Sequence, residues 1–159
     1  MKTIIIYATK YGSVEKAAQI LKSKMGGRVD LFNIMKESIP SLEKYDRVIL
    51  GGSIYVGKIQ KKLSNYTVKN LSTLLTKNIG LFICAGEKDS DVREKELIEA
   101  YPDELYQHAT TKEIFGFEIN YEKLNFLEKL VMRSKGVKKS VSKIAEDKIE
   151  VFAKKMSVN

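Results

Sequence analysis

The chain has 159 residues, of which 43% are hydrophobic and 30% charged, and its formal net charge is +8 at pH 7. This length can bury one sizeable core, so we expect a single domain over residues 1–159. The one cysteine, Cys84, excludes an internal disulfide and favours a reducing compartment. Because no apolar run in the sequence reaches the roughly 18 residues of a membrane span, a membrane-spanning protein is not expected.

The chain opens with an apolar strand pattern over Thr3–Ala8 that runs directly into a helical pattern over Ser13–Met25. The first N–H groups of a helix lack internal partners and the helix dipole adds positive charge there, so such a junction can bind an anion. Its loop offers hydroxyl donors and a glycine that lets a ligand approach the backbone. These residues are Thr9, Tyr11, Gly12 and Ser13. The junction therefore predicts a phosphate-binding loop.

Strand and helix patterns alternate over the rest of the chain. Further strands are expected over Arg28–Ile34, Arg47–Gly51, Ile79–Ala85 and Glu113–Ile119. Further helices are expected over Ile59–Leu75, Ser90–Gln107, Tyr121–Ser134 and Val141–Met156. This alternation predicts an α/β fold, with a doubly wound, five-stranded parallel sheet and helices on both faces.

Two further loops follow strands at the edge where such sheets bind ligands. After Arg47–Gly51 come small residues and a tyrosine that can stack on a flat ring. This loop contains Ser53, Ile54, Tyr55, Val56 and Gly57. After the strand expected at Ile79–Ala85, a polar turn contains Ala85, Gly86 and Glu87. One phosphate loop and two loops for a flat heterocycle favour FMN over a dinucleotide, because Gly-x-Gly-x-x-Gly is absent after the first strand.

Three segments resemble a known family. Residues 9–15, Thr-Lys-Tyr-Gly-Ser-Val-Glu, resemble the flavodoxin phosphate-loop signature Thr/Ser-x-Thr-Gly-x-Thr, with Val14 in place of the last threonine. Residues 45–57, Tyr-Asp-Arg-Val-Ile-Leu-Gly-Gly-Ser-Ile-Tyr-Val-Gly, resemble the flavodoxin-like, quinone-dependent protoporphyrinogen dehydrogenases, as do residues 121–136. The resemblance covers roughly residues 1–155 and implies a flavodoxin-like fold.

The resemblance also implies which residues bind the cofactor. It gives Thr9, Tyr11, Gly12 and Ser13 to the FMN phosphate, and Ser53, Ile54, Tyr55 and Gly57 to the ribityl chain and isoalloxazine. We include their neighbours Lys10, Val14, Val56, Ala85, Gly86 and Glu87 in the predicted cofactor site. No catalytic side chain is assigned. The sequence contains no Cys/His cluster with zinc spacing, and its single histidine, His108, has no ligand partner in view.

Positive charge is concentrated in residues 121–143, where seven Lys or Arg residues stand against two Glu, a contribution of +5. Here Leu124, Leu127, Leu130 and Val131 form a helical stripe that can pack on the sheet, whereas Phe126 and Met132 fall off it and are expected to leave apolar surface exposed. Two interpretations stay open. The lysines form the solvated face of a packed helix, or the segment contacts an anionic membrane surface. No nucleic-acid partner is expected, because no recognised binding motif accompanies the charge.

Together these features favour an FMN-dependent redox protein. The resemblance implies an oxidoreductase of heme biosynthesis that passes electrons from a reduced substrate, such as protoporphyrinogen, through FMN to a quinone. The alternative is a flavodoxin that acts as a soluble electron carrier between redox proteins, and a non-redox binding module is a third, minor reading. The basic charge argues for the enzyme, because carrier flavodoxins are typically acidic. We expect a cytoplasmic protein with peripheral contact to the inner face of the membrane; the sequence does not indicate its oligomeric state.

Overall fold

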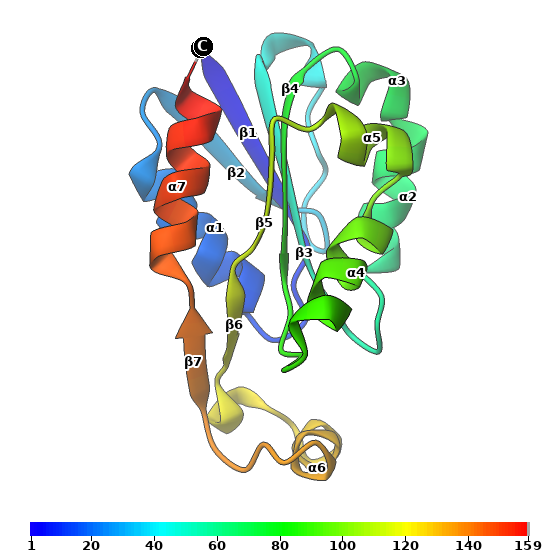
Figure 1. The fold of residues 1–159 in the computed structure, drawn as a ribbon, viewed down its shortest axis with the longest axis vertical. Helices are drawn as coiled ribbons and strands as arrows, with labels where there is room; N and C mark the ends of the chain where they lie inside the picture. Colours follow the sequence, from blue (N-terminus) through cyan, green and yellow to red (C-terminus); the bar gives the residue numbers. More distant parts are fainter. Residues whose placement is uncertain (159) are drawn as a thin grey trace.

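The computed structural model describes residues 1–158. Its main sheet has five parallel strands in the order β2-β1-β3-β4-β5 (Figure 1). They are β1 (Lys2–Tyr7), β2 (Arg28–Asn33), β3 (Arg47–Ser53), β4 (Asn78–Cys84) and β5 (Thr111–Ile114). The predicted flavodoxin-like, doubly wound five-stranded parallel sheet is confirmed.

Helices cover both faces of this sheet, as Figure 1 shows. On one face lie α1 (Ser13–Lys24) and α7 (Glu146–Ser157). On the other lie α2 (Lys61–Lys69), α3 (Leu71–Leu74), α4 (Ser90–Ala100) and α5 (Asp103–His108), and a short 3-10 helix, η1 (Leu42–Lys44), precedes β3. Each face has its own buried apolar cluster, and neighbouring residues of β1 alternate between the two, Ile4 on the second face and Ile5 on the first. This two-residue period explains why the central strands are apolar throughout.

Two of the predicted helices are each divided in two. The predicted helix Ile59–Leu75 is interrupted at Asn70, between α2 and α3. The predicted helix Ser90–Gln107 is interrupted before Pro102, because the residue that precedes a proline is disfavoured in helical conformation. Tyr101 is extended there, and its buried hydroxyl lies 3.0 Å from the Leu50 carbonyl oxygen and 2.6 Å from that of Phe82.

The prediction of one strand over Glu113–Ile119 is wrong. The chain leaves the main sheet after β5, and β6 (Gly116–Ile119) pairs antiparallel with β7 (Val141–Ile144) in a separate two-stranded sheet. Gly116 has φ +81°, and a Cβ at this position would overlap the Lys143 carbonyl oxygen. Only glycine fits this turn out of the sheet. We call residues 116–144 the excursion; Figure 1 shows it extending below the main sheet.

Inside the excursion, two further predictions need correction. The predicted helix Tyr121–Ser134 is a 3-10 turn, η2 (Tyr121–Lys123), followed by α6 (Phe126–Ser134). The Asn125 side chain accepts from the Glu128 N–H and the Glu128 side chain accepts from the Asn125 N–H, a capping box that starts α6 at Phe126. The predicted helix Val141–Met156 begins only at Glu146, because Val141 belongs to β7.

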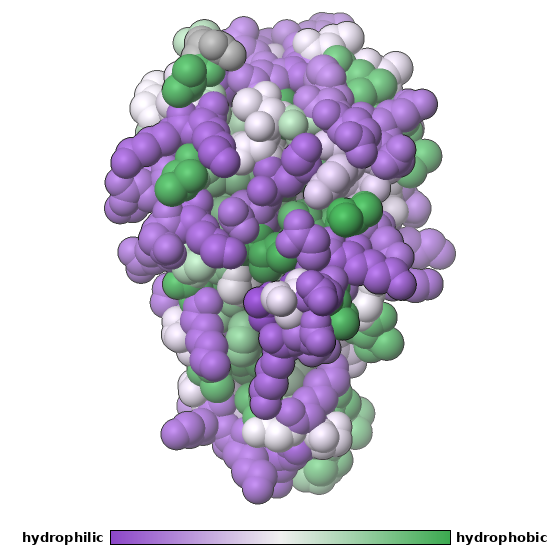
Figure 2. All heavy atoms as spheres, viewed as in Figure 1, coloured by the Kyte–Doolittle hydropathy of each residue, from purple (hydrophilic) through white to green (hydrophobic). Residues whose placement is uncertain are grey.

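The burial of α6 is partly opposite to the prediction. Met132 is buried against Tyr121 and Leu124, whereas Phe126 is 74% exposed and Leu127 71% exposed. The exposure of Phe126 was predicted, but the stripe expected to pack on the sheet is not buried at Leu127. The reason is that α6 packs on the η2 turn rather than on the main sheet. In Figure 2, hydrophobic and hydrophilic residues lie side by side at the lower tip, where Figure 1 places α6.

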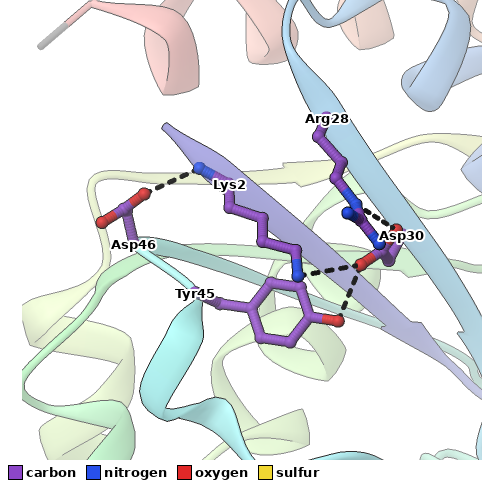
Figure 3. Close-up of polar contacts among 5 residues, drawn as sticks. All are labelled: Lys2, Arg28, Asp30, Tyr45 and Asp46. Carbon is purple, nitrogen blue, oxygen red and sulfur yellow. Dashed lines mark hydrogen bonds and ion pairs between the residues drawn. The ribbon is translucent and has the colours of Figure 1, made fainter.

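Polar contacts tie the strands together at the amino edge of the main sheet, where β1 and β2 begin (Figure 3). The Asp30 carboxylate accepts from the Tyr45 hydroxyl at 2.8 Å and pairs with the Lys2 ammonium at 3.7 Å and the Arg28 Nε at 3.4 Å. The Asp46 carboxylate accepts from the Lys2 backbone N–H at 2.7 Å. The Tyr45 hydrogen bond is the main cause that holds the pKa of Asp30 below its usual range.

Within residues 1–158, no helix combines the length and apolar character needed to cross a bilayer.

Candidate functional site

A cavity of about 580 Å³ lies at the carboxyl edge of the main sheet. The loops after β1, β3 and β4 form part of its wall, and the excursion and Glu96 of α4 add to it. Its lining includes most of the predicted cofactor residues: Lys10, Tyr11, Ser13, Ser53, Ile54, Tyr55, Val56, Gly57, Gly86 and Glu87. Three loops that are far apart in the sequence therefore meet around one space, as expected for a sheet of this class.

Four other predicted residues do not line the cavity. Val14 and Ala85 are buried in the core, at 0% and 3% exposure. Thr9 and Gly12 shape the loop instead, because the Thr9 hydroxyl oxygen accepts from the Gly12 N–H at 2.9 Å. Direct cofactor contact by these four residues stays a prediction.

The phosphate-loop geometry fits an anion. Gly12 has φ +89°, and a Cβ there would meet no atom within 4 Å, so the loop backbone is open to a ligand. Within the part of the chain that the structure describes, no side chain caps the N-terminus of α1. By contrast, the Asp89 carboxylate caps α4 by accepting from two backbone N–H groups. The first turn of α1 thus keeps the unpartnered N–H groups that an anion needs.

Two hydroxyls of this loop have different surroundings. The Ser13 hydroxyl donates to the Glu118 carbonyl oxygen and accepts from the Glu118 N–H at 2.8 Å, so it fastens β6 to the phosphate loop. The Lys16 ammonium adds an ion pair to the Glu118 carboxylate at 2.6 Å. The Tyr11 hydroxyl is buried and has the Tyr55 side chain as its neighbour. Burial, followed by the neighbouring Tyr55, raises the pKa of Tyr11 to about 12, so this hydroxyl remains a donor.

The loop after β3 is a tight turn. Tyr55 and Lys58 exchange two backbone hydrogen bonds of 2.9 and 3.1 Å, and the two central residues have positive φ, 51° at Val56 and 72° at Gly57. This is the pattern of a type I′ turn, for which Asn-Gly is the preferred pair. A β-branched valine in this conformation is strained. The turn projects the Tyr55 ring into the cavity lining.

Two ammonium groups approach the ring of Tyr55. The Nζ of Lys10 lies 3.6 Å from the ring centroid, and the Nζ of Lys135, which directly follows α6, lies 5.1 Å from it. The Tyr11 ring meets the Tyr55 ring edge-on at 6.2 Å between centroids. Two positive charges therefore lie beside the aromatic surface that is predicted to stack on a flat cofactor.

Sequence reasoning missed the wall contributed by the excursion. Phe117 lies against Gly86, and Ile119, Met132 and Val137 add further apolar lining. The available signal was Gly116, because a glycine inside a strand pattern often marks a bulge or a bend. The prediction of one strand over Glu113–Ile119 gave no indication that Phe117 lines the cavity.

Two other missed residues line the cavity and can titrate. Burial and then the charge of Glu87 raise the pKa of Glu96, and Arg93 opposes this shift. The Oε2 atom of Glu96 is buried and has no partner in the described chain. Cys84 is 2% exposed, and burial raises the pKa of its thiol.

These features fit a flavin. The cavity volume lies within the roughly 300–1,000 Å³ typical of ligand sites. Apolar walls and the Tyr55 ring suit a flat heterocycle, and the uncapped α1 N-terminus with the buried Tyr11 hydroxyl suits a phosphate.

Comparisons with known proteins agree with this assignment. A family model described as a flavodoxin domain matches residues 4–147. The protoporphyrinogen IX dehydrogenase [quinone] of Escherichia coli K12 is 31% identical over 77 residues, which cover 46% of this chain and 42% of that protein. The match thus spans less than half the length of this relative.

Solved structures share the fold. A short-chain flavodoxin associated with a non-canonical PDU bacterial microcompartment has a TM-score of 0.59 at 15% identity, over 98% of this chain and 97% of that one. The rubredoxin oxygen:oxidoreductase of Desulfovibrio gigas has a TM-score of 0.58 at 17% identity, over 98% of this chain and 35% of that one. With nearly the whole chain matched by the family model, the protein belongs to the flavodoxin domain family, whose fold supports flavin-based redox chemistry.

Proposed function

We propose that the protein is an FMN-dependent oxidoreductase that oxidises protoporphyrinogen, or a similar reduced substrate, and reduces a quinone. The observation that carries this proposal is the apolar wall that the excursion adds to the cavity, formed by Phe117, Ile119 and Val137. A wall of this kind offers the ring system of a substrate an apolar surface beside the cofactor. The partial similarity to the E. coli dehydrogenase supports the same substrate class.

The residues that would hold the cofactor are Tyr11, the first turn of α1 and the loop 53–57. When bound, FMN supplies hydride and one-electron transfer. The chain contributes binding, exclusion of water and a place for a proton. The Glu96 carboxyl can hold that proton at the cavity wall, because its raised pKa favours the protonated form.

The quinone partner fits a second feature, the exposed face of α6. Phe126, Leu127 and Leu130 are 74%, 71% and 45% exposed there, within the basic segment 121–143. Apolar side chains beside lysines suit peripheral contact with an anionic bilayer, where a lipid-soluble quinone is dissolved. We propose that the protein is cytoplasmic and approaches the inner face of the membrane through α6.

The first test is anaerobic turnover of the FMN-loaded protein, with protoporphyrinogen as donor and a menaquinone analogue as acceptor. Porphyrin fluorescence should rise faster than in a control with FMN alone. If FMN binds and porphyrin forms no faster than in the control, the enzyme proposal is wrong and the electron-carrier alternative takes its place.

The membrane contact is tested by co-sedimentation with phosphatidylglycerol vesicles. Phe126→Ser should reduce binding, because it removes an exposed apolar side chain beside the lysines. Val68→Ser is the matched control, since Val68 is 63% exposed on α2, away from the excursion. The proposed contact would be contradicted if the two variants bound phosphatidylglycerol vesicles equally well. It would also be contradicted if the protein bound neutral phosphatidylcholine vesicles as well as anionic phosphatidylglycerol vesicles.

A further inference from the structure

Two cationic side chains from distant parts of the chain converge at the cavity. Lys10 belongs to the phosphate loop and Lys135 follows α6, yet both ammonium groups lie within 5.1 Å of the centroid of the Tyr55 ring. Both residues line the cavity. We call Lys10, Lys135 and Tyr55 the two-lysine site.

Among residues 1–158, neither lysine has a carboxylate within ion-pair distance, although Glu87 and Glu96 line the same cavity. Elsewhere in the same region, the Lys16 ammonium pairs with the Glu118 carboxylate at 2.6 Å. Like charges that converge without a counterion repel each other, and the tyrosine ring offsets only part of this repulsion. The arrangement is therefore suited to binding an anion.

A third group points to the same ligand chemistry. The Nζ of Lys10 also lies 5.7 Å from the centroid of the Tyr11 ring, and the hydroxyl of Tyr11 is buried beside Tyr55. Its raised pKa, about 12, keeps it protonated. A hydroxyl donor and two ammonium groups around one cavity wall match the oxygens of a phosphate or a carboxylate.

We propose that Lys135, together with Lys10, binds an anionic oxygen group of the ligand in this cavity. The excursion then contributes a charged contact to the site in addition to its apolar wall. This inference rests on the proposed function in one respect: the group is either the phosphate of FMN or a carboxylate of the substrate. The two sources share the same chemistry and are separated by experiment.

The experiment compares Lys135→Met with Lys138→Met by isothermal titration. Lys138 is exposed in the same basic segment and is not among the cavity-lining residues, so its loss changes the net charge equally. The first arm measures the dissociation constants for FMN and for riboflavin, which lacks the phosphate. The second arm, at saturating FMN, uses mesoporphyrin, which has two propionates, and its dimethyl ester.

If the phosphate is the anion, Lys135→Met should weaken FMN binding about tenfold and leave riboflavin binding unchanged, since a charge-assisted hydrogen bond is lost. If the substrate carboxylate is the anion, FMN binding should stay the same and mesoporphyrin binding should weaken about tenfold relative to its ester. Lys138→Met should change none of these values, and Lys135→Arg should retain binding.

The inference is overturned if Lys135→Met weakens neither FMN nor mesoporphyrin binding, or if Lys138→Met produces the same losses. Failure of the proposed function is recognised separately, because the unmodified protein would then form porphyrin no faster than FMN alone in the turnover test. Circular dichroism of each variant confirms that the fold is retained.

Discussion

A lysine–tyrosine contact is found at each of the two edges of the main sheet, but only the contact at the amino edge has a carboxylate beside it. At the amino edge, the Lys2 ammonium lies 4.7 Å from the Tyr45 ring centroid, and the Asp30 carboxylate contacts both residues (Figure 3). At the carboxyl edge, the Lys10 ammonium lies 3.6 Å from the Tyr55 ring centroid with no described carboxylate in ion-pair distance. A lysine–tyrosine contact that includes its own counterion stabilises the fold, whereas one without it is suited to binding a ligand.

The largest expected loss of stability comes from a substitution at Gly116, where the excursion leaves the main sheet to form the cavity wall. Gly116→Ala should lower the free energy of unfolding by about 3 kcal/mol, because the methyl group overlaps the Lys143 carbonyl oxygen and φ is +81°. Gly136→Ala is the matched control, since Gly136 has the same φ and its Cβ would meet nothing within 4 Å. Its expected cost is about 1 kcal/mol, from the backbone conformation alone. Urea unfolding measures the stability of both variants. Equal losses would show that overlap with the Lys143 carbonyl oxygen adds nothing to the cost of the backbone conformation.

At the amino edge, Asp30→Asn should lower the free energy of unfolding by about 1.5 kcal/mol at pH 7, since hydrogen bonds to a charged group are lost. The pKa of Asp30 is lowered in the folded state, so its stabilisation is complete above the ordinary aspartate pKa of about 3.9 and is lost as the pH falls through the folded value. The difference between the two proteins should therefore disappear at low pH. Flavin affinity should not change; a weaker affinity would contradict the division between the two edges.

Strain is a further contrast between the edges. Val56 is the one non-glycine residue of the described chain with positive φ, and it lies at the carboxyl edge. Val56→Asn should raise the free energy of unfolding by about 1 kcal/mol, because asparagine tolerates this conformation. Val56→Thr keeps the β-branched shape and should give no gain. Chemical denaturation of both variants measures the free energy of unfolding. An equal gain in the two variants would show that a polar side chain, rather than relief of backbone strain, is the cause.

The smallest expected change concerns Glu96. Its pKa is raised in the folded state, so the native protein binds more protons than the unfolded chain above the ordinary glutamate pKa, and stability falls as the pH rises. Glu96→Gln removes this dependence, so its stability relative to the unmodified protein should increase from pH 4 to pH 7. Glu94→Gln, exposed on the same helix, provides the comparison. Parallel pH profiles for the two variants would contradict the assignment.

The sequence predicted those parts of the fold that depend on residues close together in the chain. The junction of β1 and α1 was predictable because its turn is made by near neighbours, such as Thr9 and Gly12. The parallel five-stranded sheet followed from the alternation of apolar strand and helix patterns. Within this part of the fold, the predicted helices differed from the structure by breaks at Asn70 and before Pro102. The second break follows from the proline itself.

The excursion was not predictable in the same way, because its causes act over long separations. The Ser13 hydroxyl binds the backbone of Glu118, 105 residues away, and the Gly116 turn is dictated by the Lys143 carbonyl group. The place of Lys135 depends in turn on how α6 packs on η2. No local pattern shows that Lys135 lies beside Tyr55.

The backbone pairing at the root of the excursion has a consequence for protein engineering. Gly116 stands opposite Ile144, and directly beside this pair the Ala145 N–H donates to the Phe115 carbonyl oxygen at 2.8 Å. Entry and exit are therefore neighbours, and the intervening residues form a loop whose removal leaves no gap to bridge in the main sheet. A short reverse turn can close this junction to give a minimal version of the fold, and the same junction is an insertion point for foreign peptides.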